Sequence, residues 1–307
     1  LSFFPHRPSG PLSPPKAFLG HGRQAQPIAT SWCLSRIALG LFKKLAVADS
    51  IGPYVDDGFR ASIFHPGITL SFVAALYFLQ IYADFSGYTD IAIGSAGLLG
   101  IRLPENFSRP YLASSISDLW RRWHASLGAW VTRYVFTPLN FAYRDRSWGI
   151  YLATISTFLL VGIWHGAGLT FVVFGLLHGL QVCLETRFGR RARPPAWLRG
   201  LQISATFVFI LFTLILFRSS SLPEAVTLMG RMFPFHPDLH LRVFDIKAIV
   251  SILFCGGFLL ALEGCMAQKK LGCPDAQTPG LNLTLILFLL TILFGNFAGS
   301  SFVYFRF

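Results

Sequence analysis

The feature that most constrains this chain is a set of long apolar blocks, one of which, residues 159–179, reads LLVGIWHGAGLTFVVFGLLHG. A run of that length is typical of a segment inside a lipid bilayer, where water cannot satisfy polar groups. The same run carries His165 and His178 together with five glycines. Because polar side chains are costly in a bilayer, the fold must hold both imidazoles in place.

The overall composition agrees with a membrane protein. Of the 307 residues, 53% are hydrophobic and only 13% are charged, whereas about a quarter of the residues of a soluble domain are charged. The net charge of +12 raises the question of nucleic-acid binding, but the basic residues flank the apolar blocks, as the positive-inside rule describes. The sequence therefore predicts an all-α polytopic membrane protein and no nucleic-acid partner.

The cysteines argue against a disulfide-stabilised or metal-binding protein, and the first residues suggest a fragment. Five cysteines, an odd number, occur without any Cys-x-x-Cys spacing, so we expect neither a disulfide framework nor a zinc or other metal site. The chain opens at Leu1 without an initiator methionine or a signal peptide, and we expect it to be a piece of a longer protein.

The first hundred residues hold shorter apolar segments interrupted by charge. Residues 29–48 are apolar, but Lys43 and Lys44 predict a helix lying at or ending in the membrane interface. Residues 68–81 predict a helix that runs into YADFSGYTD, and residues 91–101 predict a separate piece too short to span a bilayer. YADFSGYTD lacks the Gly-x-Ser-x-Gly frame of a hydrolase, so its polar residues predict structural contacts or the wall of a hydrated cavity.

Five longer apolar blocks follow, and the charges between them predict a topology. The basic loops 187–200 and 264–280 are expected in the cytoplasm, which places the loop 218–246 and the end at Phe307 outside. The blocks span residues 149–164, 169–184, 201–217, 247–262 and 281–299.

The segment 104–147 differs from a lipid-facing span, because DLWRRWHASLGAW places charges between tryptophans. This pattern predicts an amphipathic or re-entrant segment with its polar face inward. Asp118 and Arg122 are at i and i+4, which predicts a helical ion pair. His124 is a candidate functional residue here, against the alternative of an interfacial helix anchored by its tryptophans.

The two histidines of the apolar run are interpreted differently. Only Gly166, Ala167 and Gly168 separate the block that ends near His165 from the next, so the chain either turns tightly at a membrane face or breaks inside the protein. His165 is a candidate functional residue, and the alternative is a histidine satisfied by a neighbouring carbonyl. His178 is at neither i+3 nor i+4 from His165, which excludes a helical metal pair and favours a packing role.

These motifs together carry a family resemblance. QIYADFSGYTDIAIGSAGLLGIRLPENFSRPYLASSISDLWRRWHASLGAW, followed by GIWHGAGLTFVVFGLLHG, closely resembles the membrane-bound O-acyltransferase family, in its bacterial branch of alginate O-acetylation proteins. GLFKKLAVAD, LFRSSSLPEA and the terminal FVYFRF resemble the same branch, so the likeness covers nearly the whole chain. The branch normally has several further spans before the residues that open this chain.

The resemblance implies a single, partial membrane domain over residues 1–307, built as a ring of tilted helices with a central tunnel. It implies that His165, in Trp-His-Gly, is the family's signature histidine and that His124, in Arg-Trp-His, is its second active-site histidine. It also implies a transient acyl relay at Tyr304, within the aromatic motif 302–307, whereas the composition of that motif alone favours an interfacial aromatic anchor.

The function implied by the resemblance is that of an enzyme, an O-acetyltransferase that crosses the bacterial plasma (inner) membrane several times. His165 would take the proton of an acceptor hydroxyl, while His124 would orient the acceptor or stabilise the oxyanion. Arg121 and Arg122 would meet a phosphorylated donor, acetyl-CoA or an equivalent thioester, which is a substrate and not a bound cofactor. Interfacial snorkelling is the alternative for both arginines.

The partner implied by the resemblance is an esterase-like protein outside the membrane, which passes acetyl groups to an alginate-like exopolysaccharide or a wall glycan. Three alternatives stay open. D-alanyl or other acyl transfer to wall polymers is the nearest of them. A transporter would fit the glycine-broken helices, although the two halves hold no matched pair of interrupted segments. A noncatalytic membrane scaffold for the external partner is the third alternative.

Overall fold

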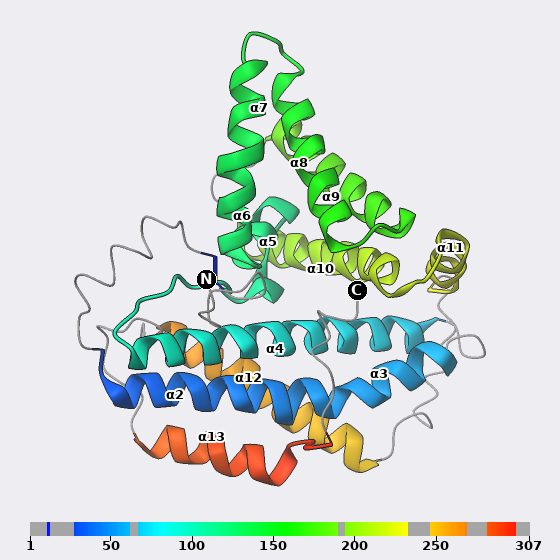
Figure 1. Ribbon diagram of the computed structural model, residues 1–307. Coiled ribbons are helices and arrows are strands. Elements are labelled where there is room, and N and C mark those ends of the chain that lie inside the picture. The colour runs from blue at the N-terminus through cyan, green and yellow to red at the C-terminus, as the bar shows by residue number, and fades with distance from the viewer. Residues whose placement is uncertain are drawn as a thin grey trace. The chain divides into compact units, whose positions relative to one another are not determined.

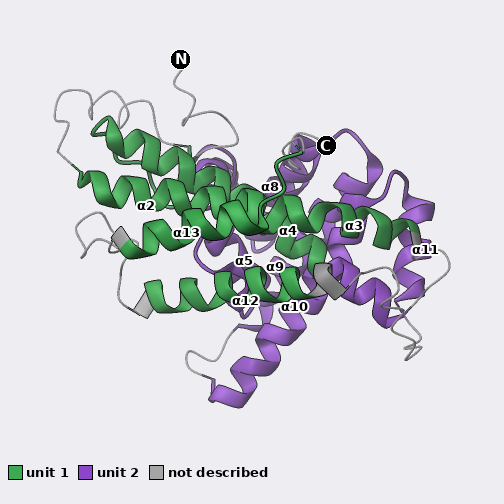
Figure 2. Cartoon of the chain, turned by 90° about the horizontal axis from the view of Figure 1, so that it is seen from below, with its two compact units in different colours: residues 1–65, 75–106, 239–306 green, residues 66–74, 107–238, 307 purple. Residues whose placement is uncertain are grey.

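The computed structural model is helical throughout the part of the chain that it describes and holds no strand there, which confirms the all-α prediction. The chain divides into two compact units, drawn in different colours in Figure 2. Unit 1 consists of residues 1–65, 75–106 and 239–306, and unit 2 of residues 66–74, 107–238 and 307. The described residues are 11–12, 28–61, 67–189, 194–232, 246–268 and 281–298.

Three described helices are long and apolar enough to cross a membrane, namely α4 (Ile68–Leu98), α9 (Leu169–Phe188) and α10 (Ala196–Arg218). The prediction of two pieces in place of α4 is wrong, because one helix of 31 residues runs through YADFSGYTD without a break. At 1.5 Å per residue this helix is about 46 Å long, more than the thickness of a bilayer core. The acidic residues stay inside it because each has a cationic partner.

Unit 1 is built around α4 and a second continuous helical rod (Figure 1). This rod consists of α2 (Thr30–Leu41), the π-helical turn η2 (Phe42–Ala48) and α3 (Asp49–Ala61). Glycines let the two rods touch through their backbones, since a Cβ on Gly40 would lie 2.5 Å from the carbonyl oxygen of Gly87. α12 (Ile246–Gln268) packs against η2, and α13 (Leu281–Phe294) packs against η2 and α2.

The π-helical turn η2 points two consecutive lysines at different carboxylates. The Nζ atom of Lys43 lies 2.9 Å from Oδ2 of Asp90 and 2.8 Å from Oε1 of Glu263. The Nζ atom of Lys44 lies 2.8 Å from Oδ1 of Asp84 and 2.8 Å from an oxygen of Asp49. Lys43 is buried and ion pairs inside unit 1 bind both lysines, so their charges do not by themselves indicate an interfacial helix. Where this helix lies relative to the membrane stays a prediction.

Arg36 and Tyr82 complete this buried charge cluster. The Nη2 atom of Arg36 bridges Asp90 at 2.5 Å and Glu105 at 2.9 Å. The hydroxyl of Tyr82 donates a hydrogen bond to Glu263 at 2.7 Å. Of the two roles left open for YADFSGYTD, the ion pairs of its acidic residues support the structural one.

Unit 2 contains a hairpin of two apolar helices, α8 (Gly149–His165) and α9, joined by only three residues (Figure 1). Their backbones touch at Gly162 and Gly175, where an added Cβ would collide with the carbonyl groups of Phe171 and Phe158. Close approach through small residues is how apolar helices associate in a membrane, where no hydrophobic force drives them together. Gly162 and Gly175 of the apolar run are therefore packing residues of this hairpin.

We expect Gly175→Val to prevent normal folding of unit 2. The new side chain would meet the backbone of Phe158, which cannot move aside as a flexible side chain can. Overpacking costs about 1–3 kcal/mol or more, and the expected result is a lower thermal midpoint and less monodisperse protein in detergent. Gly257→Val is the matched control, because nothing lies within 4 Å of a Cβ at that helical glycine. Equal stability of the two variants would contradict the prediction.

The segment 104–147 is not one amphipathic helix but a series of short elements. They are η3 (Pro110–Leu112), α5 (Ile116–Arg122), α6 (Ala125–Val131), the π-helical η4 (Thr132–Phe136) and α7 (Thr137–Ala142). The break between α5 and α6 falls at Trp123 and His124, inside the motif that the sequence presents as a single polar face. The predicted ion pair is confirmed, with Nε of Arg122 3.0 Å from Oδ1 of Asp118.

The rest of unit 2 packs against α9. α10 and α11 (Leu222–Arg231) both contact it, and α11 lies in a region for which the sequence indicated only a loop. Ser221 caps α11 and accepts a hydrogen bond from the amide of Glu224. The buried cluster of Phe174, Leu216, Phe217 and Ala225 joins the three helices beside the end of α8.

Candidate active site

His165 is the last residue of α8, and the chain re-enters a helix at Leu169. The prediction of an interruption at Gly166–Gly168 is confirmed, and it takes the form of a tight turn between two antiparallel helices. The imidazole of His165 is half-buried among aromatic rings. Its centroid lies 4.9 Å from those of Trp164 and Phe217 and 6.3 Å from that of Phe174.

His124 lies between α5 and α6 with its backbone in the left-handed region, at φ +48°. A residue with a side chain costs about 1–3 kcal/mol in such a conformation, so the surrounding structure must impose it. Its carbonyl accepts the hydrogen bond of the Gly128 amide, which starts α6. The side chain is 1% exposed. Strained and buried histidines of this kind occur at functional sites.

The two candidate histidines meet around one indole. The ring of Trp164 lies 6.3 Å from that of His124 and 4.9 Å from that of His165, centroid to centroid. Burial lowers the pKa of His124 to about 3, and the nearby His165 lowers it further as a lesser cause. His124 is therefore neutral at physiological pH and offers one ring nitrogen as donor and the other as acceptor. The catalytic roles of the two histidines stay predictions.

His178, for which the sequence favoured packing, has both ring nitrogens engaged. The indole N–H of Trp120 can only donate, so Nδ1 of His178, 3.1 Å away, is the acceptor. Nε2 then carries the proton and donates to the Thr213 hydroxyl at 3.1 Å, which donates in turn to the carbonyl of Ile210 at 3.1 Å. This chain fixes the tautomer of a fully buried ring, in agreement with a structural role.

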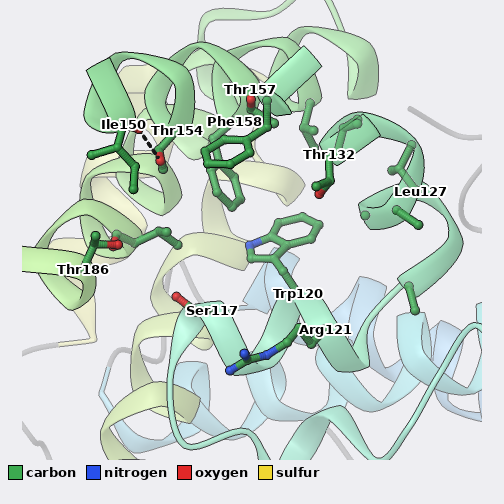
Figure 3. A pocket seen from close by; sticks show the side chains of 17 residues that line it. Ser117, Trp120, Arg121, Leu127, Thr132, Ile150, Thr154, Thr157, Phe158 and Thr186 are labelled. Carbon is green, nitrogen blue, oxygen red and sulfur yellow. Dashed lines mark hydrogen bonds between the residues drawn. The ribbon is translucent and has the colours of Figure 1, made fainter. Parts of the chain in front are cut away.

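The predicted donor-binding arginines have different environments. Arg122 is held by Asp118 and donates to the carbonyl of Ser108 at 3.2 Å. Arg121 lines a cavity of about 610 Å³, which Figure 3 shows with Trp120 projecting into its middle. The walls are mostly apolar and come from α5, α6, η4, α8 and α9. Within the described residues, Arg121 is the only charged side chain of this lining.

The cavity is next to the two histidines along the chain. Ala125, which follows His124, lines it, and so does Val161, one helical turn before His165. The hydroxyls of Thr154 and Thr157, also in the wall, donate to the carbonyls of Ile150 and Ala153, which leaves their oxygen lone pairs able to accept. A volume of this size suits a small molecule or part of a larger one.

One predicted site residue cannot be placed in the structure, and two contacts near the site were not predicted from the sequence. Tyr304 and the whole motif 302–307 lie outside the described residues, so the acyl relay stays a prediction. Sequence reasoning missed Glu185, whose carboxylate binds the start of α5, and the link between Trp120 and His178. A glutamate near the end of a strongly apolar helix is the one local signal that could have marked Glu185.

Comparison with known proteins places the chain in one family. A family model described as "MBOAT, membrane-bound O-acyltransferase family" matches residues 23–223, a range that includes both candidate histidines and the cavity. The residues that carry the resemblance in the sequence lie largely within this range.

Three relatives illustrate the range of similar proteins. "Probable alginate O-acetylase AlgI" of Azotobacter vinelandii is 34% identical over 251 residues, which are 79% of this chain and 49% of that protein. "Peptidoglycan O-acetyltransferase" of Helicobacter pylori is 36% identical over 208 residues, 64% of this chain and 37% of that protein. "Teichoic acid D-alanyltransferase" of Bacillus subtilis is 28% identical over 241 residues, 71% of this chain and 59% of that protein.

The chain spans about half the length of the curated relatives it matches. The arrangement of tilted helices in a ring with a central tunnel stays a prediction. The match over residues 23–223 covers well over half of the chain and includes the three helices that are long and apolar enough to cross a membrane. The chain belongs to the membrane-bound O-acyltransferase family.

Proposed function

We propose that the protein is an O-acyltransferase that crosses the bacterial plasma membrane several times and moves acetyl groups to hydroxyls of a polysaccharide outside the cell. The observation that carries the proposal is the meeting of His124 and His165 around Trp164, at a tight turn between two apolar helices. Two imidazoles in such a place, one of them on a strained backbone, suit the handling of protons.

In the proposed reaction His165 is the general base. Its neutral ring takes the proton of an acceptor hydroxyl while the oxygen attacks the carbonyl carbon of an acyl thioester. The tetrahedral intermediate then collapses, the carbon–sulfur bond breaks, and the thiolate leaves as a thiol when the imidazolium returns the proton. General-base assistance of this kind contributes about 10²–10⁴-fold. His124, neutral and buried, orients the acceptor or donates its N–H to the oxyanion.

The acceptor class follows from the relatives. Those named for alginate and for peptidoglycan act on polymers that carry sugar hydroxyls, which favours an exopolysaccharide or wall glycan. We further propose that an esterase-like protein outside the membrane completes the transfer and that Tyr304 carries the acyl group transiently. A phenolate is a better leaving group than an alkoxide, because the pKa of a phenol is only about 10.

D-alanyl transfer is the second candidate, and one relative carries that name. Membranes from cells that produce the protein, supplied with either radiolabelled acetyl-CoA or radiolabelled D-alanine and ATP, separate the two. We expect alkali-labile label in the polysaccharide from acetyl-CoA alone. Label from D-alanine alone would favour the second candidate. Uptake of intact label without ester formation would favour a transporter and overturn the enzyme proposal.

The cavity beside α5 supports a site for the acyl donor. Acetyl-CoA and related thioesters join phosphates to a less polar arm, and the cavity joins apolar walls to the guanidinium of Arg121. Arg122 is less suited to this role, because Asp118 and the carbonyl of Ser108 already bind its guanidinium. Of the two predicted donor-binding residues, we therefore retain Arg121.

We expect Arg121→Gln to raise the KM for acetyl-CoA about three- to tenfold with little change in kcat. A charge-assisted contact made equally in ground and transition states affects binding alone, and Arg121 is exposed enough for water to weaken it. The measurement is initial rate against acetyl-CoA concentration in membranes. Arg133→Gln is the control, because that arginine is also exposed but does not line the cavity. An unchanged KM in Arg121→Gln would remove the cavity from the donor site.

A further inference from the structure

We propose that Glu185 and His178, both on α9, are positioning residues that hold α5 and thereby set His124 in the candidate site. The proposal rests on the proposed acyl transfer, in which His124 is an active-site residue. Neither residue has to touch the substrate in this role. Both act on the short helix that leads directly into His124.

Glu185 binds the start of α5 with both carboxylate oxygens. Oε1 accepts the amide N–H of Ile116 at 2.8 Å, and Oε2 accepts both the amide and the hydroxyl of Ser117, at 2.9 and 2.5 Å. The first amides of a helix have no partner within it, and bonds to an ionised acceptor are the strong ones. Glu185 therefore ties α5 to α9 across 68 positions of sequence.

α5 does not need Glu185 in order to be helical. The hydroxyl of Ser115 already accepts the amide of Asp118 at 2.9 Å, and the carboxylate of Asp118 accepts the amide of Ser114 at 3.1 Å. Bonds of this kind around the first turn are a local pattern that starts a helix. The three bonds of Glu185 come in addition to it and join two elements that are far apart in sequence. The bonds of Glu185 determine the position of α5, whereas the local cap favours the formation of the helix.

His178 holds α5 at a second point. Nδ1 of His178 accepts the indole N–H of Trp120, and its Nε2 is anchored on Thr213 of α10. The rings of His178 and Trp120 also pack edge to face, with centroids 5.6 Å apart. Trp120 is one helical turn before His124 and forms part of the cavity wall. This contact therefore bears on both the histidine and the cavity.

The two contacts define the direction of α5 as well as its place. His178 and Glu185 are two helical turns apart and so lie on nearly the same face of α9. Glu185 binds the first turn of α5 and His178 binds Trp120. Because two points of this short helix are fixed, its direction is fixed as well. One residue, Trp123, separates the end of α5 from His124. The backbone of His124 is in the left-handed conformation, which the chain does not adopt unless its surroundings impose it.

The test is Glu185→Gln in the complete protein, assayed in membranes with acetyl-CoA. An amide offers an acceptor at only one of the two oxygen positions and puts a donor at the other, so it cannot serve both amides of α5. We expect kcat to fall about tenfold or more, since displacement of a reacting group by about 1 Å costs up to 100-fold. The KM for acetyl-CoA should rise as well, because Trp120 and Arg121 of the same helix line the cavity proposed for the donor. Hydrogen exchange of the amides of Ile116 and Ser117 should become faster.

Glu224→Gln is the matched control. Its carboxylate binds the amide and hydroxyl of Ser220 in a similar way at the start of α11, at 2.8 and 2.6 Å. A loss of kcat in Glu224→Gln equal to that in Glu185→Gln would mean general destabilisation and would overturn the proposal. Normal kcat in Glu185→Gln, with exchange at Ile116 and Ser117 either unchanged or faster, would overturn it as well.

A pair of substitutions at His178 tests the second contact. His178→Asn keeps an acceptor near the position of Nδ1 and should retain most activity, whereas His178→Leu removes it and should lose kcat about tenfold. Equal rates in the two variants would overturn the role of His178. A separate experiment tests the proposed function, because full acyl transfer in His165→Ala would reject the catalytic assignment. Amide exchange in Glu185→Gln would still measure how firmly α9 binds α5.

Discussion

His165→Ala is expected to abolish acyl transfer while the protein stays folded in the membrane. The imidazole is the proposed base, and loss of general-base assistance alone lowers the rate about 10²–10⁴-fold. The half-buried ring lies at the end of α8 against Phe217 and Phe174, so its removal leaves the glycine contact between α8 and α9 intact. The measurement is alkali-labile acetyl in the polysaccharide, normalised to the amount of protein in the membrane.

Two further variants separate the chemistry of His165 from its packing. His165→Gln keeps a polar side chain of similar length but cannot accept and return a proton, so we expect it to be as inactive as His165→Ala. Ile163→Ala is the control, because that side chain is 54% exposed and two positions away on the same helix end. Acetylation near the normal level in His165→Gln would show that the ring is not the base.

The sequence predicted the α8–α9 hairpin well, for a local reason. Its two helices are uninterrupted apolar runs, and Gly166 and Gly168 are placed where a turn needs them. The predicted blocks at 149–164 and 169–184 agree with the start of both helices and fall short of their ends by one and four residues. Helix ends are the least certain part of such a prediction, since the last turn is set by its contacts.

α4 was predicted poorly because its stability depends on distant residues. Asp84 and Asp90 interrupt the apolar pattern and suggest that the helix stops, but Lys44 and Lys43, which neutralise them, lie some forty positions earlier. No local pattern contains that pairing. The π-helical turn that directs the two lysines to separate partners is equally invisible, since its sequence, FKKLAVA, has no breaker residue.

The candidate site shows the same division between local and distant causes. The residues of Trp-His-Gly and Arg-Trp-His could be picked out from the sequence, and Ser115 with Asp118 encodes the start of α5. The left-handed conformation of His124 could not be predicted, because nothing next to it in sequence requires one. In the arrangement proposed above, the bonds from Glu185 and His178, on a helix that begins some forty-five residues later, hold α5 and thereby set the conformation of His124.

Lys43→Leu is expected to lower the stability of unit 1 strongly. The side chain of Lys43 is 6% exposed, and its ammonium neutralises the buried carboxylates of Asp90 and Glu263. Leucine is compatible with a helix and similar in volume to the lysine stem, so the backbone and packing change little. Two buried carboxylates would nevertheless lose a partner, and removal of one member of a buried ion pair costs about 3–5 kcal/mol.

Arg60→Leu is the control for Lys43→Leu, because Arg60 also pairs with an acidic residue, Asp57, but both side chains are mostly exposed. An exposed pair contributes about 0–1 kcal/mol, so that variant should unfold at nearly the normal temperature. A third variant, Lys43→Leu combined with Glu263→Gln, removes one uncompensated charge and should recover part of the loss. If Lys43→Leu and Arg60→Leu had equal thermal midpoints in detergent, the buried cluster would contribute no more than a surface ion pair. The continuity of α4 would then need another cause, because its acidic residues would not depend on their lysine partners.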